Sequence, residues 1–171
     1  MPMTERGELP LHTFWWLHDA RWYQGVKKRY GQDVANEINA EAMKFVARRV
    51  ARWFVARHGV DHAKLPMDEF VAYFKEIPRA MWPEEMTNYQ HTAVGDDTFE
   101  TVVTEHFALK MLKAARSFDG YRCPCLEMRA GWFEGMGLDV EDRRSACMTH
   151  GDAVCRFRAT VRRPEQGDAT P

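Results

Sequence analysis

All four cysteines of the chain lie in one stretch, between Cys123 and Cys155. Two of them form a Cys-Pro-Cys sequence at residues 123–125, and Cys147 and Cys155 flank a segment that contains His150-Gly151-Asp152. If those three residues form a hairpin turn, Cys147 faces Cys155 directly across two strands, with Cβ atoms about 4.5–5.5 Å apart. No other stretch is as specific, because a site shared by the four cysteines would require these segments to meet.

The composition indicates one globular domain. The chain has 171 residues, of which 45% are apolar, with 10 Phe, 6 Trp and 5 Tyr, so it can bury a substantial core without disulfides. We expect a flexible lead-in over residues 1–10, a single domain over 11–162 and a disordered tail over 163–171. The formal charge of −1 argues against nucleic acid and anionic membranes as partners.

The sequence predicts a soluble, cytoplasmic protein. The first residues contain no apolar core of a signal peptide, and no run of about 18 apolar residues could span a bilayer. In a reducing cytoplasm, clustered cysteines are more typical of metal binding or redox chemistry than of structural disulfides.

Helical periodicity dominates the first half of the chain. We predict helices over residues 11–30, 33–58 and 66–80, the last ending near Pro78. In the second helix the residues predicted to point inward are apolar: Ile38, Ala42, Phe45, Val46, Trp53 and Phe54. Its four arginines could mark a membrane-surface helix, but Glu37 and Glu41 on the same helix favour a solvated face.

The second half changes to the two-residue period of strands. Residues 89–93 and 99–106 predict a hairpin around Gly95, and 138–148 and 154–161 predict a second one. Between them we expect a helix over 107–118 and another from Pro124 to Gly137. The fold class is therefore α+β, with N-terminal helices followed by an antiparallel sheet of about four strands with packed helices.

The cysteines suit a metal site. Structural zinc takes four ligands in a tetrahedron, and a helix start near Cys123 and Cys125 would favour the thiolate forms that a metal needs. We predict Cys123, Cys125, Cys147 and Cys155 as ligands, with zinc as the cofactor and an iron–sulfur cluster as the alternative. A redox dithiol and simple buried cysteines remain open.

Three further residues are candidates for acid–base chemistry. His18 and Asp19 are neighbours on the first helix, and His106 ends a predicted strand before the cysteine stretch. His106 could also replace a cysteine as a metal ligand. The alternative for the first pair is a polar pair that lines the core, and for His106 a satisfied core or ligand-facing group.

The sequence Gly131-Trp132-Phe133-Glu134-Gly135, followed by residues 147–157, resembles the C-terminal signature of the 4-vinyl reductase domain family, which includes sensor domains of phenol- and xylene-responsive regulators. The resemblance implies an α+β ligand-binding fold, an apolar pocket for a small aromatic molecule and a zinc ion held by cysteines. Cys147 and Cys155 match its last two zinc ligands. Arg144 stands where the sensors have a ligating glutamate.

The N-terminal half resembles a second group. The segment Trp16–Tyr23, then Tyr30-Gly31 and the long second helix, are similar to proteins labelled L-2-amino-thiazoline-4-carboxylic acid hydrolase. In that group a cysteine is common where this chain has His106. The resemblance thus implies an enzyme of the hydrolase type as one reading.

Two functions follow as hypotheses. The first is a cytoplasmic module that binds a small apolar or aromatic molecule, with Trp22, Trp132 and Phe133 as ligand contacts and a structural metal beside the pocket. The alternative is a metal-assisted enzyme, a hydrolase or reductase, acting on a small heterocyclic or aromatic substrate. A homodimer is possible through a sheet edge or the aromatic stripe of the first helix.

Overall fold

The computed structural model describes residues 11–83 and 86–162. The predicted lead-in and tail, residues 1–10 and 163–171, lie outside the described residues. Within the described part of the chain, no helix has the length and apolarity that a bilayer span requires.

The α+β class is confirmed: five helices accompany one antiparallel sheet of four strands in the described residues. The helices are α1 (Leu11–Tyr30), α2 (Gln32–His58), α3 (Met67–Met81), α4 (Phe107–Ala114) and α5 (Cys125–Met136). The strands are β1 (Thr87–Ala93), β2 (Thr98–His106), β3 (Asp139–Ala146) and β4 (Cys155–Arg162), with 3₁₀ turns at His62–Lys64 and Met148–His150.

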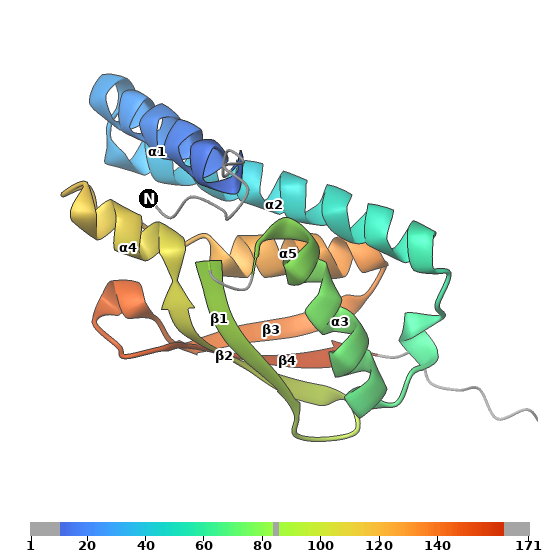
Figure 1. Ribbon diagram of the computed structural model, residues 1–171. Coiled ribbons are helices and arrows are strands. Elements are labelled where there is room, and N and C mark those ends of the chain that lie inside the picture. Colours follow the sequence, from blue (N-terminus) through green and yellow to red (C-terminus); the bar gives the residue numbers. More distant parts are fainter. Residues whose placement is uncertain (1–10, 84–85, 163–171) are drawn as a thin grey trace, which may run out of the picture.

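The sheet has the order β1-β2-β4-β3, so the two predicted hairpins lie side by side and β2 and β4 form its centre. The chain leaves the sheet after β2, forms α4 and α5, and returns as β3. Figure 1 shows α5 between the sheet and the long α2, with α3 beside α5 and α1 packed along the first half of α2. The helices therefore cover one face of the sheet.

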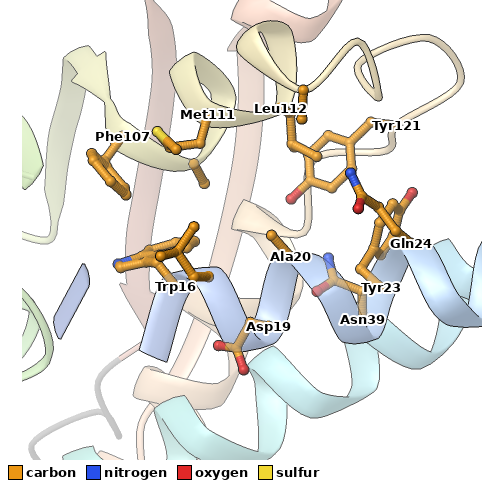
Figure 2. A pocket seen from close by; sticks show the side chains of 13 residues that line it. Trp16, Asp19, Ala20, Tyr23, Gln24, Asn39, Phe107, Met111, Leu112 and Tyr121 are labelled. Carbon is orange, nitrogen blue, oxygen red and sulfur yellow. The ribbon is translucent and has the colours of Figure 1, made fainter. Parts of the chain in front are cut away.

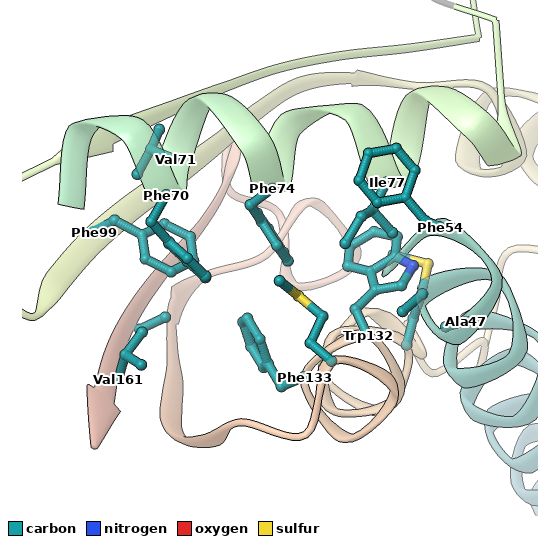
Figure 3. Packing of buried hydrophobic residues seen from close by; sticks show 14 of the residues in the cluster. Ala47, Phe54, Phe70, Val71, Phe74, Ile77, Phe99, Trp132, Phe133 and Val161 are labelled. Carbon is teal, nitrogen blue, oxygen red and sulfur yellow. The ribbon is translucent and has the colours of Figure 1, made fainter. Parts of the chain in front are cut away.

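The main core lies where α3 and α5 meet the sheet. Phe74 is fully buried there, and its ring lies 5.4 Å from those of Phe99 and Phe133 and 5.8 Å from that of Trp132. Figure 3 shows the side chains of α3 pointing toward those of α5. Phe70, Val71 and Phe74 form the buried side of α3, and the helix continues through Pro78 to Met81 instead of ending near Pro78 as predicted.

The contact between α2 and α5 is made by small residues. Ala47 and Ala51 of α2 are fully buried, and a Cβ atom on Gly131 of α5 would lie 2.3 Å from the carbonyl oxygen of Lys44. The prediction that Phe45, Val46 and Trp53 point inward was wrong, since these side chains are 45–55% exposed. Close backbone approach requires the alanine and glycine face, and this turns the large residues to the opposite side.

One charged side chain lies inside this core. Arg129 of α5 is 2% exposed, donates two hydrogen bonds to the carboxylate of Asp142, and donates a third to Thr101 Oγ1 at 3.0 Å. Its guanidinium carbon also lies 4.8 Å from the centre of the Phe157 ring. The charge is thus paired, and each of the three guanidinium nitrogens donates a hydrogen bond, as a buried arginine requires.

Candidate functional site

The four cysteines meet in the folded chain. Cys125 is the first residue of α5 and Cys123 lies two residues before it, Cys147 directly follows β3 and Cys155 starts β4. All four are at most 4% exposed. With Val103 and Phe157 they form one buried cluster, in which the Sγ atoms of Cys123 and Cys125 lie 2.8 Å apart. The segments predicted to converge do converge.

The second hairpin achieves this through a bulge. Arg144 pairs with Phe157 but Ala146 pairs with Arg156, so one extra residue on β3 shifts the register. Continuing this register by one residue would set Cys147 opposite Cys155, and both residues lie in the same buried cluster. The connection itself differs from the predicted three-residue turn, because a 3₁₀ turn at Met148–His150 precedes Gly151. The Cys147 backbone N–H donates to Asp152 Oδ2 at 2.7 Å and closes the loop.

The thiols differ in their acidity. The hydrogen bond with Cys125 lowers the pKa of Cys123 to about 7, and the same contact raises the pKa of Cys125. Burial raises the pKa of Cys155 to about 12, although its sulfur accepts a hydrogen bond from the Met148 backbone N–H. Of these three thiols, Cys123 is therefore the most readily ionised near neutral pH.

The cluster fits zinc in its donors but not in its present spacing. Four buried thiols match a structural zinc site, and thiolates around one zinc ion lie about 3.8 Å apart for Zn–S bonds of about 2.3 Å. The Cys123–Cys125 sulfur distance of 2.8 Å is shorter than this. Among the described residues, no group of three or more His, Cys, Asp or Glu side chains is spaced to hold a metal ion as it stands.

The loop that leads into the cysteines is held by Asn36 of α2. This buried side chain accepts hydrogen bonds from Tyr23 Oη at 2.7 Å and from the Arg122 backbone N–H at 3.0 Å, and donates to the Gly120 carbonyl at 2.9 Å. Asn36 therefore ties α1 and the loop after α4 to the same point of α2 and positions Tyr121 next to the cysteine cluster.

A cavity of about 70 Å³ lies between α1 and α4. Figure 2 shows Trp16 and Ala20 of α1 facing Phe107 and Met111 of α4, with Tyr121 closing one end. Asp19 and Asn39 also reach this cavity. The pKa of Tyr121 is raised, chiefly by burial, so its phenol stays protonated.

A larger cavity of about 460 Å³ shares its wall with the first. Trp16, Asp19, Asn39, Ala108 and Tyr121 line both. The larger one continues past Met43 and Val50 of α2 and Trp82, and ends at the residues His106, Cys125 and Met128. It thus runs from α1 to the edge of the cysteine cluster.

A small inner chamber of about 40 Å³ lies beyond that end, against the sheet. Trp82, His106, Cys125 and Met128 line both spaces, and His91 and Trp132 are among the other residues of the chamber. Neither Nε2 of His91 nor Nδ1 of His106 has a hydrogen-bond partner, although both atoms are buried. The chamber can hold a water-sized group, which needs about 10–15 Å³.

A chain of hydrogen bonds leads to His91. Thr101 Oγ1 accepts a hydrogen bond from Arg129 and lies 2.7 Å from His91 Nδ1. When the Thr101 hydroxyl donates to Nδ1, His91 carries its proton on Nε2, as an N–H donor without a partner. Burial, with Arg129 and Lys75 nearby, lowers the pKa of His91 to about 3, so the ring is neutral.

His106 reaches the same chamber because of a bulge in the first hairpin. Asn88 pairs with Glu105 but Tyr89 pairs with Val103, so Thr104 is an extra residue on β2. The bulge turns His106 to the side of the sheet that Val103 occupies. Burial lowers the pKa of His106 to about 4, so this ring is also neutral.

The predicted site residues are distributed unevenly. His18 and Asp19 are about two-thirds exposed, with Nδ1 and Oδ1 3.2 Å apart, and Asp19 alone of the two borders the cavities. Trp22 is 48% exposed and lies outside the cavity walls. Trp132 lines the inner chamber and donates from Nε1 to Met81 Sδ at 3.1 Å, whereas Phe133 belongs to the core.

Several residues of the site were not recognised from the sequence. Trp16, Trp82 and Tyr121 form cavity walls, and His91 and Arg129 form the polar chain behind the chamber. Arg129 carried a signal, since it stands among apolar residues of a buried helix. His91 alternates with polar residues on β1 and carried none.

Two solved structures share the fold. A trafficking protein particle complex subunit 3 from Naegleria fowleri, covalently bound to palmitic acid, matches with a TM-score of 0.57 and 14% identity, over 88% of this chain and 95% of that chain. The phenol-responsive sensory domain of the transcription activator PoxR, solved with phenol, matches with a TM-score of 0.60 and 11% identity, over 85% of this chain and 73% of that chain. Membership of the 4-vinyl reductase domain family stays a prediction.

None of the curated proteins matches the chain. A family model does: it covers residues 15–159, which include most of α1, strands β1 to β3, the first part of β4 and all four cysteines. This agrees with the resemblance noted for residues 16–31 and the long second helix. The chain belongs to the L-2-amino-thiazoline-4-carboxylic acid hydrolase family.

Proposed function

We propose that the protein binds a small, flat, uncharged molecule that lies in the larger cavity and places one polar group in the inner chamber. The observation that carries the proposal is that His91 and His106 line one chamber and that each has a buried nitrogen, Nε2 and Nδ1 respectively, without a hydrogen-bond partner. A buried donor without a partner is destabilising by about 1–3 kcal/mol, and a ligand oxygen would remove that penalty.

The lining favours an uncharged ligand. Among the described residues that line the connected cavities of about 70 and 460 Å³ there is no Lys or Arg, and Asp19 would repel an anion. Arg129 borders the inner chamber, but Asp142 neutralises it. A ligand carboxylate would therefore lose its hydration without gaining a cation, which is unfavourable.

Size and lining support an aromatic ring. The larger cavity, at about 460 Å³, falls in the range of small-molecule sites, about 300–1,000 Å³. Trp16 and Trp82 offer flat faces, and Met43 and Met128 offer adaptable surface. The two structures of the same fold hold phenol and palmitic acid, both with largely apolar bodies.

Three probes of similar size test the proposal: phenol, toluene and benzoate. Phenol should raise the melting temperature and quench the fluorescence of Trp16 and Trp82, toluene should act more weakly, and benzoate should have no effect. His91→Phe should remove the advantage of phenol over toluene and leave toluene binding intact. If none of the three probes changes melting or fluorescence, the proposal fails.

We propose further that Cys123, Cys125, Cys147 and Cys155 hold a structural zinc ion in a reducing compartment such as the cytoplasm. Zinc would stabilise all four thiolates at once, which the cluster cannot do alone. Metal analysis of protein purified without chelator should find one zinc per chain and no iron–sulfur absorbance. Cys147→Ser and Cys155→Ser should lower metal content and melting temperature together; unchanged zinc stoichiometry would contradict the site.

Hydrolysis of a small heterocycle is the second candidate, and the family match over residues 15–159 favours it. His106 Nδ1 borders the larger cavity next to Cys125 and could accept a proton from water. The direct assay offers L-2-amino-thiazoline-4-carboxylic acid and measures the thiol freed when the ring opens at a carbon–sulfur bond. Turnover by the unaltered protein that is lost in His106→Phe would establish this activity. Because the described residues that line the two connected cavities include no cation to bind the carboxylate of this substrate, we expect no turnover.

A further inference from the structure

We propose that two copies of this chain associate through the outer face of α2, which is turned away from α5. Phe45 lies at the centre of this face and is 55% exposed. Because Ala47 and Ala51 contact α5, a residue two positions from Ala47 points about 200° away from that contact. We define the outer face of α2 by Val34, Ile38, Glu41, Phe45, Arg49 and Arg52.

Apart from Lys44, which pairs with Glu134 of α5, the exposed charges on this helix change sign at Phe45. The exposed acids Asp33, Glu37 and Glu41 precede it, and the exposed Arg49, Arg52 and Arg57 follow it. In the described part of the chain, none of these six side chains forms an ion pair. The face therefore carries unused charge of both signs.

A twofold axis through Phe45 pairs these charges. When two α2 helices cross in antiparallel directions, positions equally far before and after the axis meet, so Glu41 faces the second copy's Arg49 and Arg49 faces its Glu41. Phe45 packs on its own equivalent, and Ile38 covers the stem of Arg52. Rows of residues four apart, such as Glu41, Phe45 and Arg49, are the ridges of the commonest helix packing.

The sign change selects a second copy over an anionic membrane. A membrane-surface helix needs cations along its polar face, whereas the first half of α2 is acidic and the whole chain has a charge of −1. A face that is complementary to itself when reversed is the property that an isologous dimer requires.

Sedimentation velocity of the full chain tests the proposal by charge exchange. The unaltered protein should sediment as a dimer, and Glu41→Arg or Arg49→Glu should each raise the dimer dissociation constant at least about tenfold, because like charges then face each other twice. The double variant, with both exchanges, should restore the dimer. Lys110→Glu on α4, an exposed charge reversal elsewhere, should have no effect.

Mixing the two single variants gives the sharpest result. Glu41→Arg and Arg49→Glu chains should remain monomeric alone and form a heterodimer together, since each then meets its opposite charge. A monomeric unaltered protein at all accessible concentrations would overturn the proposal. A dimer that ignores both charge reversals, or binding of the unaltered monomer to phosphatidylserine vesicles through this face, would overturn it as well.

Discussion

Helix α2 packs differently against α5 than against α1. Toward α5 the contact uses alanine and glycine, and a Cβ on Gly135 would lie 2.5 Å from the Arg48 carbonyl oxygen, so backbones touch and no space remains. Toward α1 and α4 the walls are Trp16, Phe107 and Tyr121, yet cavities of about 70 and 460 Å³ lie between them. Small residues thus form the closely packed interface between α2 and α5, and large residues line the cavities beside α1 and α4.

The comparison shows how the fold keeps a cavity open. Aromatic side chains fill the space between two helices only when the helices that carry them come close together. Here the hydrogen bonds of Asn36 to Tyr23 and to the loop after α4 fix the position of α1 relative to α2 and α4. The close α2–α5 contact fixes α2 on its opposite side. Close packing between α2 and α5 therefore allows the cavities beside α1 and α4 to stay open.

The largest effect is expected at Arg129 on the filled side. Arg129→Ala leaves the carboxylate of Asp142 buried without its partner and should lower the free energy of unfolding by about 3–5 kcal/mol, measured by urea denaturation. Arg129→Met combined with Asp142→Leu should recover most of the loss. Arg143→Ala, which removes an exposed pair with Glu141, is the control and should cost no more than about 1 kcal/mol.

Ala47→Leu tests the absence of space between α2 and α5. Ala47 is fully buried, and its Cβ would lie 3.0 Å from a Cβ on Gly131. The added atoms should separate the helices and destabilise the protein by about 1–3 kcal/mol in the same denaturation experiment. A neutral result would mean that this side is as loose as the other.

The histidines of the inner chamber should make stability depend on acid. Burial lowers the pKa of His91 to about 3 and that of His106 to about 4, both below the ordinary 6.5 of the unfolded chain. Their contribution is complete above pH 6.5 and is lost as the pH falls toward 4 and 3, because only the unfolded chain then binds the protons. Each histidine should contribute at most about 1.4 kcal/mol per pH unit to the slope of the unfolding free energy against pH.

His106→Phe should remove one of these two contributions. The difference in unfolding free energy between the variant and the unaltered protein should therefore change between pH 7 and pH 4.5 and stay constant between pH 7 and pH 8. A difference that is the same at all pH values would show that His106 titrates normally in the folded protein.

Ala108→Leu should have the smallest effect on stability. Ala108 borders both cavities, so the larger side chain finds free volume and the free energy of unfolding should change by less than about 1 kcal/mol. Phenol should then raise the melting temperature less, since the added side chain takes up part of the volume where the two cavities meet. An undiminished effect of phenol would place the ligand elsewhere, and a loss of stability as large as that of Ala47→Leu would remove the contrast between the two sides.

Most elements could be predicted from the sequence because their signals are local. The long second helix begins after Gly31 and ends at Gly59, which adopts a left-handed conformation with φ of 63°. The two hairpins follow from the two-residue period of residues 87–106 and 139–162. The periodicity of apolar residues predicted the wrong inward face for α2, because the small size of Ala47 and Ala51, and not hydrophobicity, decided which side contacts α5.

The cysteine stretch was predicted to hold a hairpin pair next to a helix start, and Cys147 and Cys155 do meet Cys123 and Cys125 in one cluster. The reason is again local: strand pairing and the start of α5 are set by nearby residues. The cavity could not be predicted, because its wall joins Trp16, Trp82 and Tyr121, which are far apart in the chain.

The sequence by itself thus determined the α+β class, the order of the elements and the convergence of the cysteines, since turns, periods and helix ends depend on neighbouring residues. Only the tertiary structure decided that His91 and His106 share a chamber. That meeting depends on a bulge at Thr104 and on Arg129 reaching Thr101 from another element. The direction of a side chain in a sheet changes with a single extra residue, and that residue has no signal of its own in the sequence.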